Sequence, residues 1–305
     1  MKNKKISYIN AIIVIIIVLS FGFIMNVFFK HYALNDFAIK EESKFFIFGD
    51  SHAATNFFQS DNGIQNFGYG SEPPNLTLLK LKYLFTEERY EKLKAVIVIS
   101  PHNISKCHEM RFFNNDSTAA ILSKHWVIID NQYVFDHYNN LPIKTKAVIH
   151  LKKFFGAPSM ENSFLIKTAF KGGFKYLEGN SELNDKALIE ANNRHFGNAN
   201  FNYKNNVSYR LKEYYYNIFN FLKIKNIETI VVSTPLHDTY WNLLTNEQIL
   251  NYQTFINEIE TDYSEIKVLN YSRKKMSDKY FFNGDHLNKE GAIIFTDLFI
   301  KDIKI

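Results

Sequence analysis

The stretch Phe45-Phe46-Ile47-Phe48-Gly49-Asp50-Ser51-His52 decides the fold of this chain. Four large apolar residues in succession predict a strand that is buried on both faces, and the Gly-Asp-Ser turn marks its end. In an open α/β sheet, the carboxyl ends of the strands present the working residues. Ser51 is therefore a candidate nucleophile with a rigidly held hydroxyl group. The alternative is that Ser51 only caps the helix that follows.

A second stretch, Asn283-Gly284-Asp285-His286-Leu287-Asn288, lies near the other end of the sequence. A serine hydroxyl is a weak nucleophile and needs an adjacent base. The imidazole of His286 fits that role, because it would take the proton of Ser51 and later return it to the leaving group. The alternative for His286 is a packed, hydrogen-bonded histidine without a catalytic role.

Strand and helix signals alternate along the rest of the chain, which predicts an α/β fold with a parallel sheet covered on both sides. The predicted strands are 45–48, 64–67, 95–100, 227–233 and 266–269. The predicted helices are 76–94, 207–222, 246–261 and 289–301, the last of them capped by Asn288. Residues 105–200 are less regular, and we interpret them as an insertion that caps the carboxyl edge of the sheet.

The N-terminus predicts a membrane anchor. Residues 6–29 carry no charge, and lysines precede them. A helix needs roughly 20 apolar residues to cross a bilayer, so we favour a signal anchor over a cleaved signal. The basic flank predicts a cytoplasmic N-terminus. The predicted organisation is an anchor at 1–30, a tether at 31–44 and a catalytic domain at 45–305, outside the cytoplasm of a single-pass cell-membrane protein.

Composition excludes other functional classes. The 305 residues are 46% hydrophobic and 22% charged, which is ordinary for a globular protein, and the net charge of +5 is spread along the chain. Without a sustained basic stripe beyond the N-terminus, we expect no nucleic-acid partner. One cysteine, Cys107, excludes an intramolecular disulfide. Although His102, Cys107 and His108 are close in sequence, they lack a repeated ligand spacing, so we expect neither a metal nor another cofactor.

An acyl-transfer site also needs donors for the oxyanion that forms. The candidates follow predicted strands: the backbone N–H groups of Ser51 and of Gly68 or Gly70, and the side-chain amide of Asn103. Glycine suits such a position because the backbone must approach the substrate closely.

Four short blocks carry a resemblance to a known family. They are Gly49-Asp50-Ser51, Gly68-Tyr69-Gly70 and Pro101-His102-Asn103 after the first three predicted strands, and Asn283 to His286 before the last helix. Together they resemble the SGNH (GDSL-type) hydrolase superfamily. Gly-Asp-Ser-His early and the segment Asp285 to Ala292 late are similar to its membrane-anchored branch, which includes alginate O-acetyltransferase-like and teichoic acid D-alanyl transfer proteins. The resemblance implies a flavodoxin-like, three-layer α/β/α fold and serine-dependent cleavage or transfer of an acyl ester. It implies Ser51 as nucleophile and His286 as base.

Two positions depart from the family pattern. Pro101 stands where the third block normally begins with glycine, and Asn283 stands where the triad acid normally lies. We therefore favour Asp285 as the group that orients His286. The alternatives are Asn283 and a serine–histidine pair without a third member.

The predicted function is an extracytoplasmic esterase or O-acyltransferase that acts on a cell-surface polysaccharide or related glycan. A transferase would need a polytopic membrane partner to supply acyl groups, whereas an esterase would not. The alternative is a non-catalytic protein for glycan binding or assembly on an SGNH-like scaffold, which Asn283 and Pro101 favour.

Overall fold

The structure is a computed structural model of the chain. It describes residues 2–35, 39–59, 63–86, 93–113, 143–144, 146–147, 175, 177–179, 183, 185–197 and 202–303. The chain divides into two compact units. One comprises Met1–Ala38 with Asp116–Phe170, and the other comprises Ile39–Asn115 with Lys171–Ile305. The second unit contains the sheet and the candidate site.

Five parallel strands form the sheet in the order β2-β1-β3-β4-β5. Their bounds are β1 Phe45–Phe48, β2 Ile64–Asn66, β3 Lys94–Val98, β4 Glu228–Ser233 and β5 Lys267–Asn270. This order is the one that flavodoxin-like folds have, with a topological switch point between β1 and β3. Residues Phe45 to Phe48 pair with Lys94 to Ile97 in register. The segments that follow β1 and β3 therefore begin side by side at the carboxyl edge.

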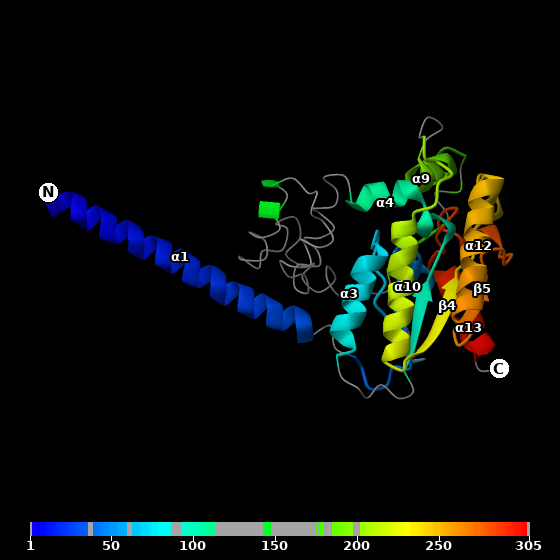
Figure 1. Cartoon of the computed structure of the whole chain (residues 1–305), viewed down its shortest axis with the longest axis horizontal. Helices are drawn as coiled ribbons and strands as arrows, with labels where there is room; N and C mark the ends of the chain where they lie inside the picture. Colours follow the sequence, from blue (N-terminus) through cyan, green and yellow to red (C-terminus); the bar gives the residue numbers. More distant parts are fainter. Residues whose placement is uncertain are drawn as a thin grey trace. The chain divides into compact units, whose positions relative to one another are not determined.

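Helices cover both faces of the sheet (Figure 1). The helices on one face are α3 Pro74–Leu84, α10 Tyr209–Ile224 and α12 Asn246–Asp262; those on the other are α2 Ser51–Asn56 and α13 Lys289–Ile303. Alternate residues of β1 point to opposite faces: Phe48 stacks on Phe67, whereas Ile47 belongs to the cluster that contains Phe295. The result is a three-layer α/β/α fold.

The predicted strands are confirmed to within two residues at each end. The N-cap predicted for the last helix is also confirmed, since Asn288 Oδ1 accepts the Gly291 N–H at 3.0 Å. The helix predicted at 76–94 is present, but its predicted C-terminal end is wrong. It stops at Leu84, where the Phe85 N–H still bonds the Leu81 carbonyl before the backbone leaves the helix. The remaining described elements are the short helices η1 Pro101–Ile104, α4 Lys106–Phe113, α9 Asp185–Phe196, α11 Asp238–Asn242 and η2 Asp278–Tyr280.

The N-terminal segment forms the helix α1, Lys2–Asn35. Among the described residues, no helix is both long and apolar enough to cross a membrane, so the described part of the chain does not support the anchor predicted at 1–30. Most of the cap predicted at about 105–200 lies outside the described residues. Its described parts, α4 and α9, pack against each other.

Candidate functional site

A cavity of about 350 Å³ is lined by residues that follow β1 and β3, as the switch-point rule requires. This volume is in the usual range for a small-molecule site. Ser51, Gly70 and His102 contribute from the strand ends, and His286 contributes from the loop before α13. His195 contributes from α9, which belongs to the described part of the predicted cap. The cavity therefore brings together both stretches on which the sequence analysis depends.

The turn after β1 fixes Ser51 at the first position of α2. Gly49 has φ +140°, and a Cβ atom there would lie 3.1 Å from the carbonyl oxygen of Val98, so glycine is required. Asp50 caps the helix, because its carboxylate accepts the His52 N–H at 3.0 Å. The cap belongs to Asp50, which leaves the hydroxyl of Ser51, a partly buried residue, to line the cavity.

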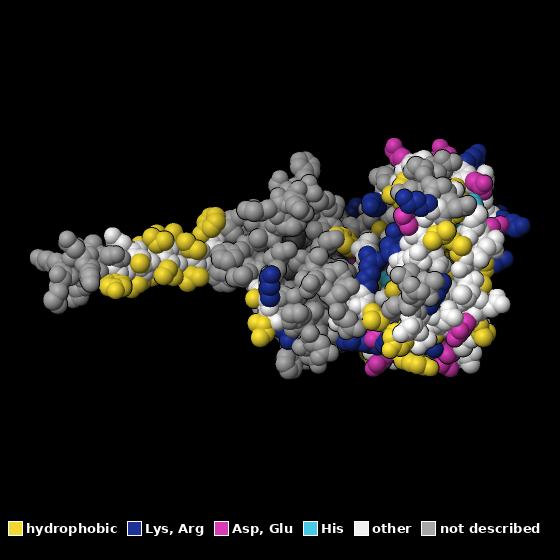
Figure 2. Space-filling model, turned by 90° about the horizontal axis from the view of Figure 1, so that it is seen from above, with side chains coloured by type: hydrophobic (Ala, Val, Ile, Leu, Met, Phe, Trp, Pro, Cys, Tyr) yellow, Lys and Arg dark blue, Asp and Glu magenta, His cyan; other side chains and the backbone are white. Residues whose placement is uncertain are grey.

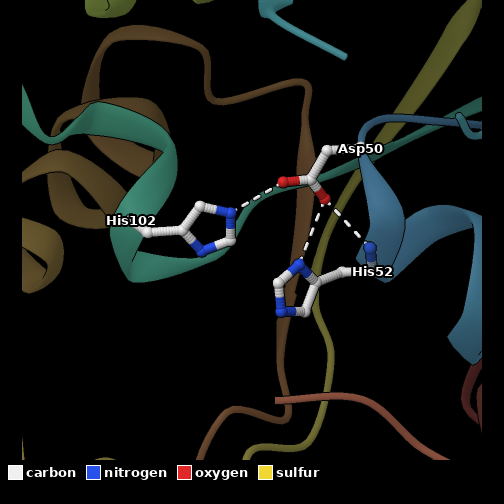
Figure 3. Close-up of side chains that lie close together, drawn as sticks. All are labelled: Asp50, His52 and His102. Carbon is white, nitrogen blue, oxygen red and sulfur yellow. Dashed lines mark hydrogen bonds and ion pairs between the residues drawn. The ribbon is translucent and has the colours of Figure 1, made fainter. Parts of the chain in front are cut away.

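Figure 3 shows the Asp50 carboxylate between two imidazoles. His52 Nδ1 lies 3.1 Å from Oδ1, and His102 Nε2 lies 2.7 Å from Oδ2. The Asn103 amide also donates to Oδ2, at 2.8 Å. Burial raises the pKa of Asp50, but the two histidines lower that pKa further, and the balance lies well below the usual value. Asp50 is therefore a buried anion that ties the ends of β1 and β3 together.

The loop before α13 holds His286 in a defined orientation. An antiparallel bridge between Phe281 and Leu287 closes the loop. Within it, Asn283 Oδ1 accepts the backbone N–H groups of Asp285 and His286, and it lies 3.1 Å from the ring Nδ1 of His286. Asp285 Oδ1 lies 3.3 Å from the same Nδ1. Asn283 and Asp285, the two candidates for the third member of the triad, therefore both contact Nδ1 of His286. The other ring nitrogen, Nε2, stays available for proton transfer.

Asp285 is completely buried, and neither carboxylate oxygen accepts a hydrogen bond from a described residue. It is surrounded by positive or ionisable groups: His195 Nε2 at 3.5 Å, His52 Nε2 at 3.8 Å and a guanidinium nitrogen of Arg194 at 3.9 Å. Burial raises the pKa of Asp285, but His286, His195 and His52 lower that pKa further, to well below its usual range. Asp285 therefore stays ionised, with its negative charge next to Nδ1 of His286.

No hydrogen bond joins the Ser51 hydroxyl to His286 in this structure, although both residues line the cavity. Their two segments are nevertheless joined by Asn56, a fully buried residue at the end of α2. Its Oδ1 accepts the Leu287 N–H at 2.9 Å, and its amide donates to Thr234 at 2.8 Å. Asn56 therefore fixes the helix that carries Ser51 against the loop that carries His286.

Besides the Ser51 N–H, the three other candidate oxyanion donors have different surroundings. The Gly68 N–H already donates to Asn66 Oδ1 at 2.8 Å. The Asn103 amide is engaged with Asp50, and its oxygen accepts the Ser100 N–H at 2.7 Å. Gly70 is exposed and lines the cavity. Of the two glycines, Gly70 is the one whose backbone can approach a substrate.

We expect Gly68→Ala to destabilise the fold by about 1–3 kcal/mol, because overpacking a rigid backbone contact costs this much. A Cβ atom at Gly68 would lie 2.5 Å from the Ala54 nitrogen, whereas a Cβ at Gly70 would have no neighbour within 4 Å. Gly70→Ala is therefore the matched control. Denaturant midpoints measure the difference; equal stabilities of the two variants would contradict the packing role of Gly68.

Sequence reasoning gave His102, His108 and His195 no catalytic role, yet all three line the cavity. The rings of His102 and His195 stack at 4.0 Å, and His108 lies edge-on to His102 at 5.0 Å. Burial contributes most to lowering the pKa of each of these histidines, so neutral rings are favoured. The signal that could have found His102 is its place directly after β3.

Two groups of described side chains have ligand atoms close enough to hold a metal ion: Asp50 with His52 and His102, and His52 with Asp285 and His286. An ion in the first group would replace the hydrogen bonds that Asp50 makes with its two imidazoles. An ion in the second group would compete for His286 as a base. Metal binding and the serine chemistry are thus alternatives that a chelator can distinguish.

Comparison with known proteins gives little beyond this geometry. No protein-family model matches the chain. No curated protein matches it. Among solved structures, the chain is similar to a proposed acylhydrolase from Bacteroides fragilis, with 12% sequence identity, coverage of 90% of this chain and 94% of the other, and a TM-score of 0.40. A likeness at this level does not assign an activity.

Proposed function

We propose that this chain is a serine-dependent acyl-ester enzyme of the SGNH type, with Ser51 as nucleophile and His286 as base. The observation that carries the proposal is that these two residues, from opposite ends of the sequence, line one cavity at the switch point of the sheet. The orientation of His286 supports it, because contacts to Nδ1 from Asn283 and Asp285 leave Nε2 for proton transfer.

The proposed reaction has two steps. In the first, the Ser51 hydroxyl loses its proton to His286 Nε2 as its oxygen bonds to the acyl carbon, and the resulting oxyanion collapses to release the alcohol, which takes that proton. In the second, water or another hydroxyl group attacks the acyl-enzyme and restores Ser51. A side-chain rotation brings the hydroxyl to His286, since catalytic hydrogen bonds are often long before substrate binds. Asp285 stabilises the imidazolium, and the N–H groups of Ser51 and Gly70 receive the oxyanion.

The same proposal includes the substrate, the cellular location and the source of the acyl group. The substrate is an O-acyl group, such as acetyl, on a cell-surface polysaccharide or related glycan, and the chain works outside the cytoplasm. An O-acyltransferase would receive its acyl groups from a polytopic membrane partner, whereas an esterase would act alone. An assay on aryl acetates with and without an oligosaccharide acceptor separates the two, because only a transferase acetylates the acceptor.

A fluorophosphonate probe tests the chemistry directly, because it is attacked by an activated serine and stays attached. We expect stoichiometric labelling of the purified chain at Ser51, unaffected by a metal chelator. Ser264→Ala is a suitable control, since this exposed serine precedes β5 at the opposite edge of the sheet. Labelling should disappear in Ser51→Ala and persist in Ser264→Ala.

A folded protein that never reacts with the probe would favour the second candidate, a non-catalytic glycan-binding or assembly protein. The separation between the Ser51 hydroxyl and His286, which no hydrogen bond bridges, is the observation that favours that candidate. Loss of activity on chelation would instead favour one of the two His/Asp groups as a metal centre.

A further inference from the structure

Among the described residues that line the cavity containing Ser51, three are cationic. They are Arg111 on α4, Arg194 on α9, and Lys175, which precedes α9 in the sequence. Asp50 is the only acidic residue among the described residues of the lining, and it is buried and already contacts two histidines. Figure 2, which looks onto the molecule from above, shows a histidine beside clustered Lys and Arg side chains.

Arg111 and Arg194 line the same cavity. Burial contributes most to lowering the pKa of Arg111, and the charge of Arg194 lowers that pKa further. Arginine stays protonated in proteins, so both groups keep their charges at this cavity. Guanidinium groups at one cavity favour the entry of an anion, because opposite charges attract. Arg194 is 3.9 Å from buried Asp285, and that single carboxylate is shared with three histidines.

A second, independent observation concerns His108, which lies one turn before Arg111 on α4. It is 97% buried, with an exposed fraction of 3%, and it lines the cavity. Neither of its ring nitrogens has a hydrogen-bond partner among the described residues. An unpaired buried polar group is costly, so it indicates a partner that arrives with the ligand.

We propose that the cavity holds an anion subsite, formed by Arg111, Arg194 and Lys175 with His108 as an additional hydrogen-bond donor, which binds an oxyanion group on the alcohol portion of the ester substrate. That the substrate is an ester rests on the proposed function, but the anion subsite itself requires only the cavity. The acyl group of the proposed substrate is small, so the remaining volume accommodates the alcohol portion. Carboxylate and phosphate share the chemistry that guanidinium groups recognise.

The kinetic test uses three acetyl esters of phenols: 4-acetoxybenzoate, 4-acetoxyphenyl phosphate and the neutral methyl 4-acetoxybenzoate. We expect the wild type to prefer at least one anionic ester over the neutral one by roughly tenfold in kcat/KM, because one charge-assisted hydrogen bond contributes about this much. Arg111→Gln should remove the preference and leave the neutral ester within about twofold. The preference for carboxylate or phosphate identifies the oxyanion.

Arg273→Gln is the matched control, because Arg273 lies over the Trp241 ring and does not line the cavity. It should keep the preference. Equal kcat/KM values for all three esters in the wild type would overturn the subsite, and so would equal losses on the anionic and neutral esters in Arg111→Gln.

A binding measurement separates failure of the subsite from failure of the proposed chemistry. Calorimetry with Ser51→Ala and the same three compounds requires no turnover. Tighter binding of an anionic ester, weakened roughly tenfold by Arg111→Gln, supports the subsite even if the wild type hydrolyses nothing. Binding of the anionic and neutral esters with the same affinity would refute the subsite even if Ser51 proves to be catalytic.

Discussion

Replacing Ser51 by alanine should lower kcat on an aryl acetate by roughly a thousandfold or more, because removal of the nucleophile from a serine–histidine pair removes covalent catalysis altogether. The change removes one oxygen atom from the first residue of α2, whose cap is the carboxylate of Asp50 rather than the serine hydroxyl. Stability should therefore change by less than about 0.5 kcal/mol, as for other substitutions away from a cap or the core.

His286→Ala should produce a loss of similar size, and the double variant should be no worse than either single variant, because nucleophile and base act as a unit. Single-turnover release of nitrophenol from 4-nitrophenyl acetate measures the acylation step. Ser264→Ala should keep wild-type kinetics. If Ser51→Ala retained more than about a tenth of the wild-type rate, the hydrolysis would have to use another nucleophile.

Patterns local in sequence predicted most of the fold. Runs such as Ala95 to Ile99 combine β-branched residues with an absence of charge, and such runs form the strands. The end of α3 could not be predicted in the same way. Residues 85–94 contain Glu and Lys, whose composition fits a helix, and the helix stops because the backbone at Phe85 leaves helical geometry.

The site was only partly predictable, because its contacts join distant segments. The place of Ser51 follows from the strand before it, but the pairing of Asp50 with His102 depends on β1 and β3 lying next to each other. Asn56 reads in sequence as an ordinary polar helix residue, although it joins α2 to the His286 loop. The distinction between Gly68 and Gly70 depends on free space, which no local pattern reveals.

Substitution of Asp285, whose carboxylate lies next to Nδ1 of His286, should have the second large effect on kcat. We expect Asp285→Asn to lower kcat by roughly a thousandfold, because it removes the charge that stabilises the imidazolium. Asn283→Ala should cost only about tenfold, the value of one hydrogen bond to the ring. The ranking follows from the structure: Asn283 holds the loop and the ring by neutral contacts, whereas Asp285 brings a buried negative charge to 3.3 Å from Nδ1.

A rescue variant separates electrostatic stabilisation from simple loop geometry. Asn283 Oδ1 lies 3.1 Å from the same Nδ1, so Asn283→Asp places a carboxylate within reach of the ring. Added to Asp285→Asn, it should restore about tenfold or more of the lost rate, because it returns a negative charge to the imidazole without changing the size of either side chain. Single-turnover kinetics and a thermal unfolding curve for each variant provide the readout. Should Asn283→Ala prove far more damaging than Asp285→Asn at equal stability, Asn283 would be the group that supports His286, and the buried charge of Asp285 would serve the fold instead.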